Sequence, residues 1–121
     1  MNFEFDEDKP IYKQLIEKFK LAIITNYYKS GDRLPSVRDL AMDSKVNPNT
    51  IQRALAELES EGLIFTKRTL GKFVTEDQDV IVKIKQEIAN SKIETFISDM
   101  QKLHITAEEV IRLIEERKEK E

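Results

Sequence analysis

The chain of 121 residues contains no cysteine and only one histidine, His104. Without cysteine, neither a disulfide framework nor a thiolate metal site can form. Acid–base or metal chemistry would require partners for His104, and the sequence supplies no second His or Cys. A glycine-rich phosphate-binding loop is also missing. We therefore expect a protein that is not an enzyme and that holds no metal or cofactor.

Long hydrophobic runs are missing as well. No apolar segment approaches the roughly 20 residues that are needed to cross a bilayer. The first residues, Met1 to Asp8, are acidic where a secretory signal would be basic and then apolar. The length suits one small domain with an appendage and leaves no room for a large sensor or catalytic domain. These features lead us to expect a cytoplasmic protein.

Charge is distributed unevenly along the chain, although the formal net charge is only −3. Residues 9–75 contain 12 basic and 7 acidic side chains, whereas residues 1–8 and 76–121 are both acidic. Attraction to phosphate depends on the local field, so the central segment could face nucleic acid while the ends remain acidic. Such a modest excess is, by itself, more typical of a solvated surface.

A first helix is predicted from Pro10 to Tyr28. Proline is well tolerated in a first helical turn, and apolar residues recur at three- and four-residue steps. This apolar face comprises Tyr12, Leu15, Ile16, Phe19, Ala22, Ile23 and Tyr27. A second stripe of Leu21, Ile24 and Tyr28 indicates either a wide core face or a subunit contact.

Two short capped helices follow. Ser36 has the character of an N-cap for a helix that runs through about Asp43. After a tight turn, Asn47 caps a third helix, Pro48 occupies its first turn and Gly62 ends it. This spacing is typical of a helix-turn-helix.

The outward face of the third helix carries side chains that can contact base edges. It comprises Asn49, Gln52, Arg53 and Ala56, with Thr50 at its border. Asn and Gln can bond adenine, Arg can bond guanine, and methyl groups can contact thymine. A polar outward face is common on surface helices. Here it indicates DNA binding because the helix that carries it is the second of a tight pair.

A hairpin is predicted next, with strands at residues 63–67 and 72–75. Gly71 can supply the positive φ that a tight turn needs. The basic residues Lys67, Arg68 and Lys72 gather at its tip. They fit either a solvated hairpin end or a cationic wing that contacts the DNA backbone or minor groove.

The remaining segment, residues 77–121, is predicted to form two apolar helices, the second starting at a Thr106–Glu109 capping box. Two such helices cannot bury their apolar faces alone, so they must pack on the first helix, on a second subunit or on both, and we favour a subunit contact. The residues predicted to form it are Leu21, Ile24, Tyr28, Ile84, Ile88, Phe96, Ile97, Met100, Val110 and Ile114. The fold class is thus mainly α with a small β-hairpin: a winged helix-turn-helix over residues 1–76 and a helical dimerisation region over 77–121.

These motifs resemble the GntR-type bacterial transcription regulators and, among them, the small YtrA-like subfamily. The resemblance covers about residues 3 to 75 by motif, and the rest by length and helical pattern. The motifs are Pro10-Ile-Tyr-Lys-Gln-Leu, Gly31-Asp-Arg-Leu-Pro-Ser-Val-Arg-Asp-Leu-Ala, Val46-Asn-Pro-Asn-Thr-Ile-Gln-Arg-Ala-Leu and Leu58-Glu-Ser-Glu-Gly-Leu-Ile. The resemblance implies a homodimeric, sequence-specific DNA-binding regulator, usually a repressor and often of a transporter operon.

The resemblance also implies residue roles. Arg38 corresponds to a phosphate-clamping arginine and Gly71 to the wing glycine. With the positions noted above, the residues expected to contact operator DNA are Ser36, Arg38, Asn47, Asn49, Thr50, Gln52, Arg53, Lys67, Arg68, Gly71 and Lys72. The alternative is a winged-helix module that docks protein or RNA without sequence-specific DNA binding.

This chain departs from the family pattern in several places. Lys45 stands in the helix-turn-helix turn, and Thr69 at the wing tip, where relatives often carry glycine. Pro48 and Gln52 stand where relatives outside the subfamily often carry arginine. The operator of those relatives therefore does not transfer to this chain.

Overall fold

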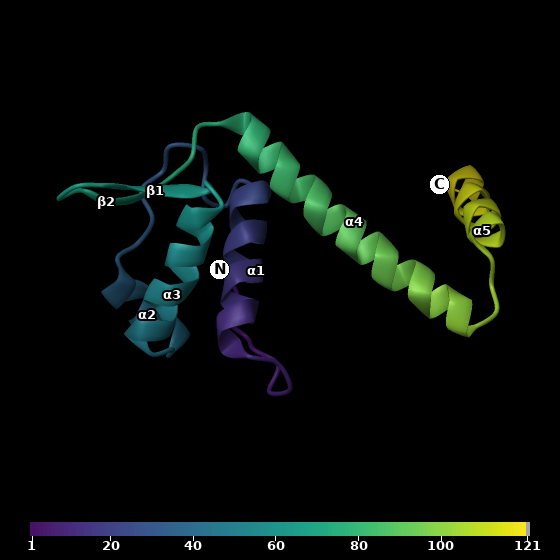
Figure 1. Cartoon of the computed structure of the whole chain (residues 1–121), viewed down its shortest axis with the longest axis horizontal. Coiled ribbons are helices and arrows are strands. Elements are labelled where there is room, and N and C mark those ends of the chain that lie inside the picture. Colours follow the sequence, from purple (N-terminus) through teal and green to yellow (C-terminus); the bar gives the residue numbers. More distant parts are fainter. Residues whose placement is uncertain (121) are drawn as a thin grey trace. The chain divides into compact units, whose positions relative to one another are not determined.

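The computed structural model describes residues 1–120, which contain five helices and one antiparallel strand pair (Figure 1). The elements are α1 (Ile11–Ile24), α2 (Val37–Ser44), α3 (Pro48–Ser60), β1 (Ile64–Lys67), β2 (Gly71–Val74), α4 (Gln78–Lys102) and α5 (Ala107–Lys120). The predicted fold class, mainly α with a small hairpin, is confirmed. The chain divides into two compact units, and the first runs from Met1 to Ile84.

Helix α1 ends at Ile24, four residues before the predicted end at Tyr28. Asn26 adopts the left-handed conformation with φ 64°, a geometry that asparagine tolerates better than most residues. The amide of Tyr28 then donates to the carbonyl of Ala22 at 3.1 Å. Tyr28 therefore lies in the connection beyond the helix.

The two capped helices form as predicted. The Ser36 hydroxyl oxygen accepts from the amide of Asp39 at 3.1 Å, and the Asn47 side-chain oxygen accepts from the amide of Asn49 at 2.8 Å. Each cap satisfies one of the free amides at a helix start. Lys45, with φ 58°, closes α2 in the left-handed conformation that a glycine usually adopts.

The core of the first unit joins α1, α2, α3 and the hairpin. Its fully buried large side chains are Phe19, Leu15, Leu40, Ile51, Leu55, Leu58, Leu63, Ile64 and Val74. Helix α3 contributes an inward stripe that packs mainly on α1 and α2, with β1 beside it. Burial of this stripe fixes which face of α3 points outward.

The segment around Arg33 pairs with strand β2 of the hairpin, which was not predicted from the sequence. Arg33 forms a β-bridge with Phe73, and the amide of Leu34 donates to the carbonyl of Lys72 at 2.8 Å. The amide of Val74 in turn donates to the carbonyl of Asp32 at 2.9 Å. The segment that precedes α2 is thereby attached to the wing.

The second unit begins at Lys85 and contains the rest of α4 together with α5. Helix α4 ends at Lys102, and beyond it His104 adopts the left-handed conformation with φ 58°. The amide of Ile105 donates to the carbonyl of Met100 at 3.0 Å. Thr106 caps α5, because its hydroxyl oxygen accepts from the amide of Glu109 at 3.2 Å. Among residues 1–120, no helix is both long and apolar enough to cross a membrane.

Replacing Leu58 by alanine tests the role of the α3 inward stripe. Leu58 is 0% exposed, so the cavity should lower the free energy of unfolding by about 2–5 kcal/mol. Met42→Ala is the control, because Met42 is 67% exposed and its loss should change stability by less than about 0.5 kcal/mol. Urea titrations measure both variants, and equal losses would contradict the packing described.

Candidate nucleic-acid interface

The outward face of α3 is polar and open to solvent. Asn49, Gln52, Arg53 and Ala56 are exposed, and Thr50 is half-buried at the border of the face. The buried residues of α3, which include Ile51 and Leu58, lie on the opposite side of the helix. The structure thus brings the predicted base-contacting residues together on one surface.

The residues that cap α2 and α3, Ser36 and Asn47, are both exposed. Ser36 and Asn47 use a side-chain oxygen for the cap, which leaves the hydroxyl hydrogen of Ser36 and the amide hydrogens of Asn47 able to donate. Arg38 follows in the first turn of α2 and is exposed. These groups can donate to phosphate oxygens without disturbing the caps.

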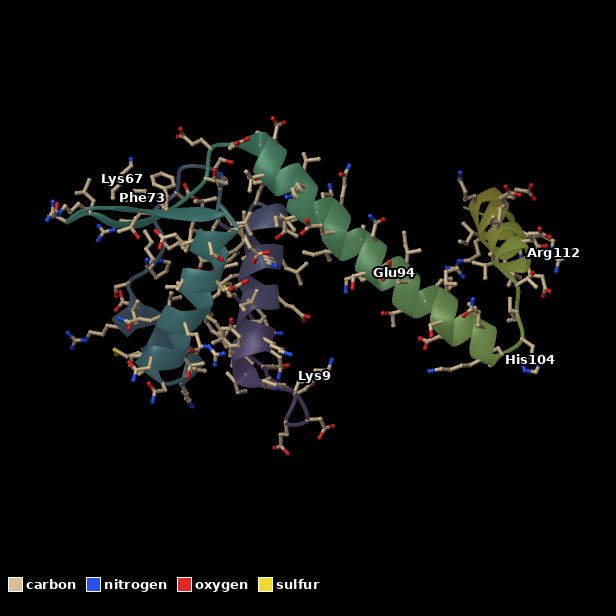
Figure 2. All side chains as sticks on the ribbon, in the orientation of Figure 1. Lys9, Lys67, Phe73, Glu94, His104 and Arg112 are labelled. Atoms are coloured by element: carbon tan, nitrogen blue, oxygen red, sulfur yellow. The ribbon has the colours of Figure 1, made fainter. Side chains whose placement is uncertain are left out.

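Lys67 lies on an aromatic platform on the wing. Its Nζ is 4.6 Å from the ring centroid of Phe73 and 5.7 Å from that of Phe65, and the two rings stack with centroids 6.0 Å apart. Figure 2 shows Lys67 beside Phe73 on the hairpin. Attraction between an ammonium and the ring faces keeps this charge at the wing, and Arg68 follows it in the turn.

Lys72 differs from the sequence-based prediction, which placed it with the cations of the wing tip. Its Nζ lies 3.4 Å from the Glu59 carboxylate on α3 and 2.9 Å from the Thr66 hydroxyl. The hydrogen bond that Thr66 donates, and then the charge of Lys72, lower the pKa of Glu59. Lys72 therefore links the wing to α3 instead of extending from the tip.

Arg33 is a cation of this surface that the sequence analysis did not select. Its side chain passes over Gly71, whose φ is +112°, and a Cβ at Gly71 would lie 3.2 Å from the Arg33 Nε. Glycine is needed here both for the positive φ and for this close approach. Arg33 lies in the motif that begins at Gly31, but only its pairing with Phe73 shows that it adjoins the wing.

The cations of this region fall into two groups. The ion pairs of residues 1–120 join Lys20 to Glu61, Lys72 to Glu59, Lys102 to Asp99 and Arg112 to Glu116. The basic residues of segment 33–72 that take part in none of these pairs are Arg33, Arg38, Lys45, Arg53, Lys67 and Arg68. This second group supplies the positive field of the candidate interface.

The residues predicted to form a subunit contact have mixed environments. Ile84 and Val110 are buried within a single chain, at 4% and 5% exposure. Ile24, Tyr28, Ile88, Ile97 and Met100 are half-buried, whereas Leu21, Phe96 and Ile114 are exposed. Further exposed apolar residues of the second unit, which the prediction did not include, are Ile93, Leu103, Ile111 and Leu113.

Comparisons with known proteins match this geometry. Residues 11–74 match the family model described as bacterial regulatory proteins of the gntR family. The HTH-type transcriptional regulator YhcF of Bacillus subtilis is 36% identical over 111 residues, which cover 92% of each chain. The HTH-type transcriptional repressor YtrA of the same organism is 36% identical over 109 residues, or 84% of each chain. These relatives are regulators, so the prediction that the chain is not an enzyme is confirmed.

Solved structures agree. A GntR family transcriptional regulator from Listeria monocytogenes is 46% identical, with a TM-score of 0.85, over 93% of this chain and 98% of that one. The DNA-binding domain of AraR in complex with an operator has a TM-score of 0.54 and 25% identity, and the match covers 62% of this chain and 92% of that one. A fold similar to most of this chain therefore occurs in a protein bound to DNA.

The lowered pKa of Glu59 makes the link between α3 and the wing pH-dependent. A carboxylate with a lowered pKa stabilises the folded state above its ordinary pKa of 4.5, and this contribution is lost as the pH falls through the lower value of the folded state. Glu59→Gln should therefore reduce stability by about 0.2–1 kcal/mol at pH 7, and the difference from wild type should shrink below pH 4.5. Unfolding titrations over a pH series measure it, with Glu57→Gln as control, and a difference independent of pH would contradict the assignment.

Proposed function

Because the chain belongs to the GntR family of bacterial regulatory proteins, we propose that it is a homodimeric transcriptional repressor that binds an inverted-repeat operator. The observation that supports it best is the exposed polar face of α3, bordered on the wing and α2 by cations that take part in none of the ion pairs of residues 1–120. Such a surface suits the major groove, and the wing suits the neighbouring backbone or minor groove. A regulator of this kind acts on DNA in the cytoplasm.

Base contacts are assigned to the outward face of α3. The amides of Asn49 and Gln52 can bond adenine, Arg53 can bond guanine, and the methyl groups of Thr50 and Ala56 can contact thymine. The side chains assigned to phosphate are Ser36, Arg38, Asn47, Lys67 and Arg68, and their contacts fix the orientation of the protein without selecting a sequence. Lys72 is not assigned to phosphate, because its ammonium already bonds Glu59 and Thr66.

Dimerisation is assigned to the apolar face of the second unit. Ile93, Phe96, Ile97 and Met100 recur on one face of α4 at the spacing of successive helical turns, and Ile93 and Phe96 are 56% and 43% exposed. Exposed apolar surface of this kind usually marks an association site. A two-fold symmetric dimer would present two α3 helices to half-sites about one turn of DNA apart, which is why an inverted repeat is proposed.

We propose repression for two reasons, the function named for a similar protein and the ability of a bound dimer to block the operator. The relative YtrA, similar over 84% of this chain, carries the name of a transcriptional repressor. A dimer bound across an operator can exclude polymerase without contacting any other protein. Sequence-specific DNA binding distinguishes a repressor of this kind from a winged-helix module that docks protein or RNA.

Selection from a random duplex library tests sequence-specific binding directly. The purified full chain is incubated with 40-base-pair random duplexes, a length of about four helical turns, at near-physiological salt, and retained DNA is amplified and sequenced. We expect enrichment of an inverted repeat with half-sites about 10 base pairs apart. Retention that falls with salt but enriches no sequence would contradict the proposed operator recognition, and a complete lack of retention would favour a docking module.

The dimer is tested by placing charge on the exposed face of α4. The double substitution Ile93→Glu and Phe96→Glu should convert a dimer of two 14.2 kDa chains into monomers, because like charges would meet across the apolar contact. Met42→Glu, at an exposed apolar residue of α2, is the control and should remain dimeric. Sedimentation velocity measures all three proteins. A monomeric wild type, or a double variant that stays dimeric, would contradict the assignment.

A further inference from the structure

Arg53 does not extend freely from the outward face of α3. Its guanidinium carbon lies 3.9 Å from the ring centroid of Tyr12, which stands in the first turn of α1. Tyr12 is half-buried and Arg53 is exposed, so the ring supports the guanidinium from the protein side. This contact joins two helices at the border of the candidate interface, and the sequence analysis had placed Tyr12 only in the core face of α1.

We propose that Tyr12 is a positioning residue for base recognition, because its ring holds the Arg53 guanidinium at the α1 border of the interface. The inference rests on the proposed function, in which Arg53 bonds a guanine. In this role Tyr12 does not itself bond a base. Its ring influences the selectivity at the one base pair of each half-site that Arg53 contacts.

The chemistry of the contact supports this role. A guanidinium that is stacked on an aromatic face keeps its N–H groups in its own plane, pointing away from the ring and free to donate. A carboxylate partner would instead occupy those donors, as Glu61 does for Lys20 and Glu59 for Lys72. The ion pairs of residues 1–120 do not include Arg53. The ring therefore orders the arginine and leaves its donors available.

The guanidinium of Arg53 lies on the same face of α3 as the other residues assigned to base contacts. Asn49 precedes Arg53 by one helical turn and Ala56 follows it by about one turn, and all three are exposed. An unrestrained arginine would lose much side-chain freedom when it bonds a base. Tyr12 removes part of that freedom before DNA arrives, so less is lost on binding.

The test compares full-chain variants on the duplex that the wild type selects, and on duplexes with single base-pair changes in each half-site. Arg53→Ala should weaken binding to the selected duplex about 5- to 150-fold and abolish selectivity at one base pair. Tyr12→Leu, which removes the ring, should weaken it about 3- to 30-fold and reduce selectivity at the same base pair. Tyr12→Phe retains the ring and should match wild type.

Two comparisons separate positioning from a general structural effect. The double variant Tyr12→Leu/Arg53→Ala should bind no more weakly than Arg53→Ala, because the two residues act as a unit. Lys67→Ala should weaken all duplexes alike and keep the base preference, since its contact is assigned to phosphate. Tyr12→Gln provides a second side chain without a ring, and circular dichroism establishes that each variant is folded.

The binding results can contradict the proposed DNA-contacting surface and the positioning role of Tyr12 separately. If Arg53→Ala keeps its affinity and its base preference, the proposed contact surface is wrong. If Arg53→Ala loses the preference while folded Tyr12→Leu or Tyr12→Gln keeps it, the positioning role alone is wrong. A loss for Tyr12→Leu that is equal on all duplexes, and additive with Arg53→Ala, would also overturn the positioning role.

Discussion

The packing of α3 against α1 determines where the other features of the interface lie. Phe19 and Leu58 are both 0% exposed, and burial of each such side chain contributes about 1.5–3 kcal/mol. Because the inward stripe of α3 is fixed in this way, Asn49 and Gln52 must face solvent. The same packing brings the first turn of α1 beside α3, where Tyr12 meets Arg53. One buried contact therefore sets both the direction and the border of the surface assigned to DNA.

The basic residues around α3 divide into those that pair with a carboxylate of the protein and those that can bind phosphate or bases. Lys20 lies 3.1 Å from Glu61, the residue that caps the C-terminus of α3, and Lys72 lies 3.4 Å from Glu59 in the last turn of that helix. The N-terminal half of α3 carries no acidic residue, so Arg53 and the basic residues around it keep their field. Lys67 and Arg53 are instead held by aromatic rings, which fix a cation without neutralising it.

Much of this arrangement could be predicted from local sequence signals. Ser36, Asn47 and Pro48 mark the helix starts through short-range chemistry, and the inward stripe of α3 follows from a spacing of three and four residues. Contacts between distant segments could not be predicted in this way. The bridge from Arg33 to Phe73, the bond from Lys72 to Glu59 and the stacking of Arg53 on Tyr12 each depend on side-chain directions that only the folded chain defines.

The most direct test of the account is to map the DNA-contacting surface by NMR. Uniformly labelled protein is titrated with the duplex it selects, and changes in backbone amide shifts are assigned to residues. We expect the largest changes on α2, on the N-terminal half of α3 and on the wing turn near Arg68. Changes that are confined to α4 and α5, or that spread evenly over the chain, would contradict the assignment of this surface.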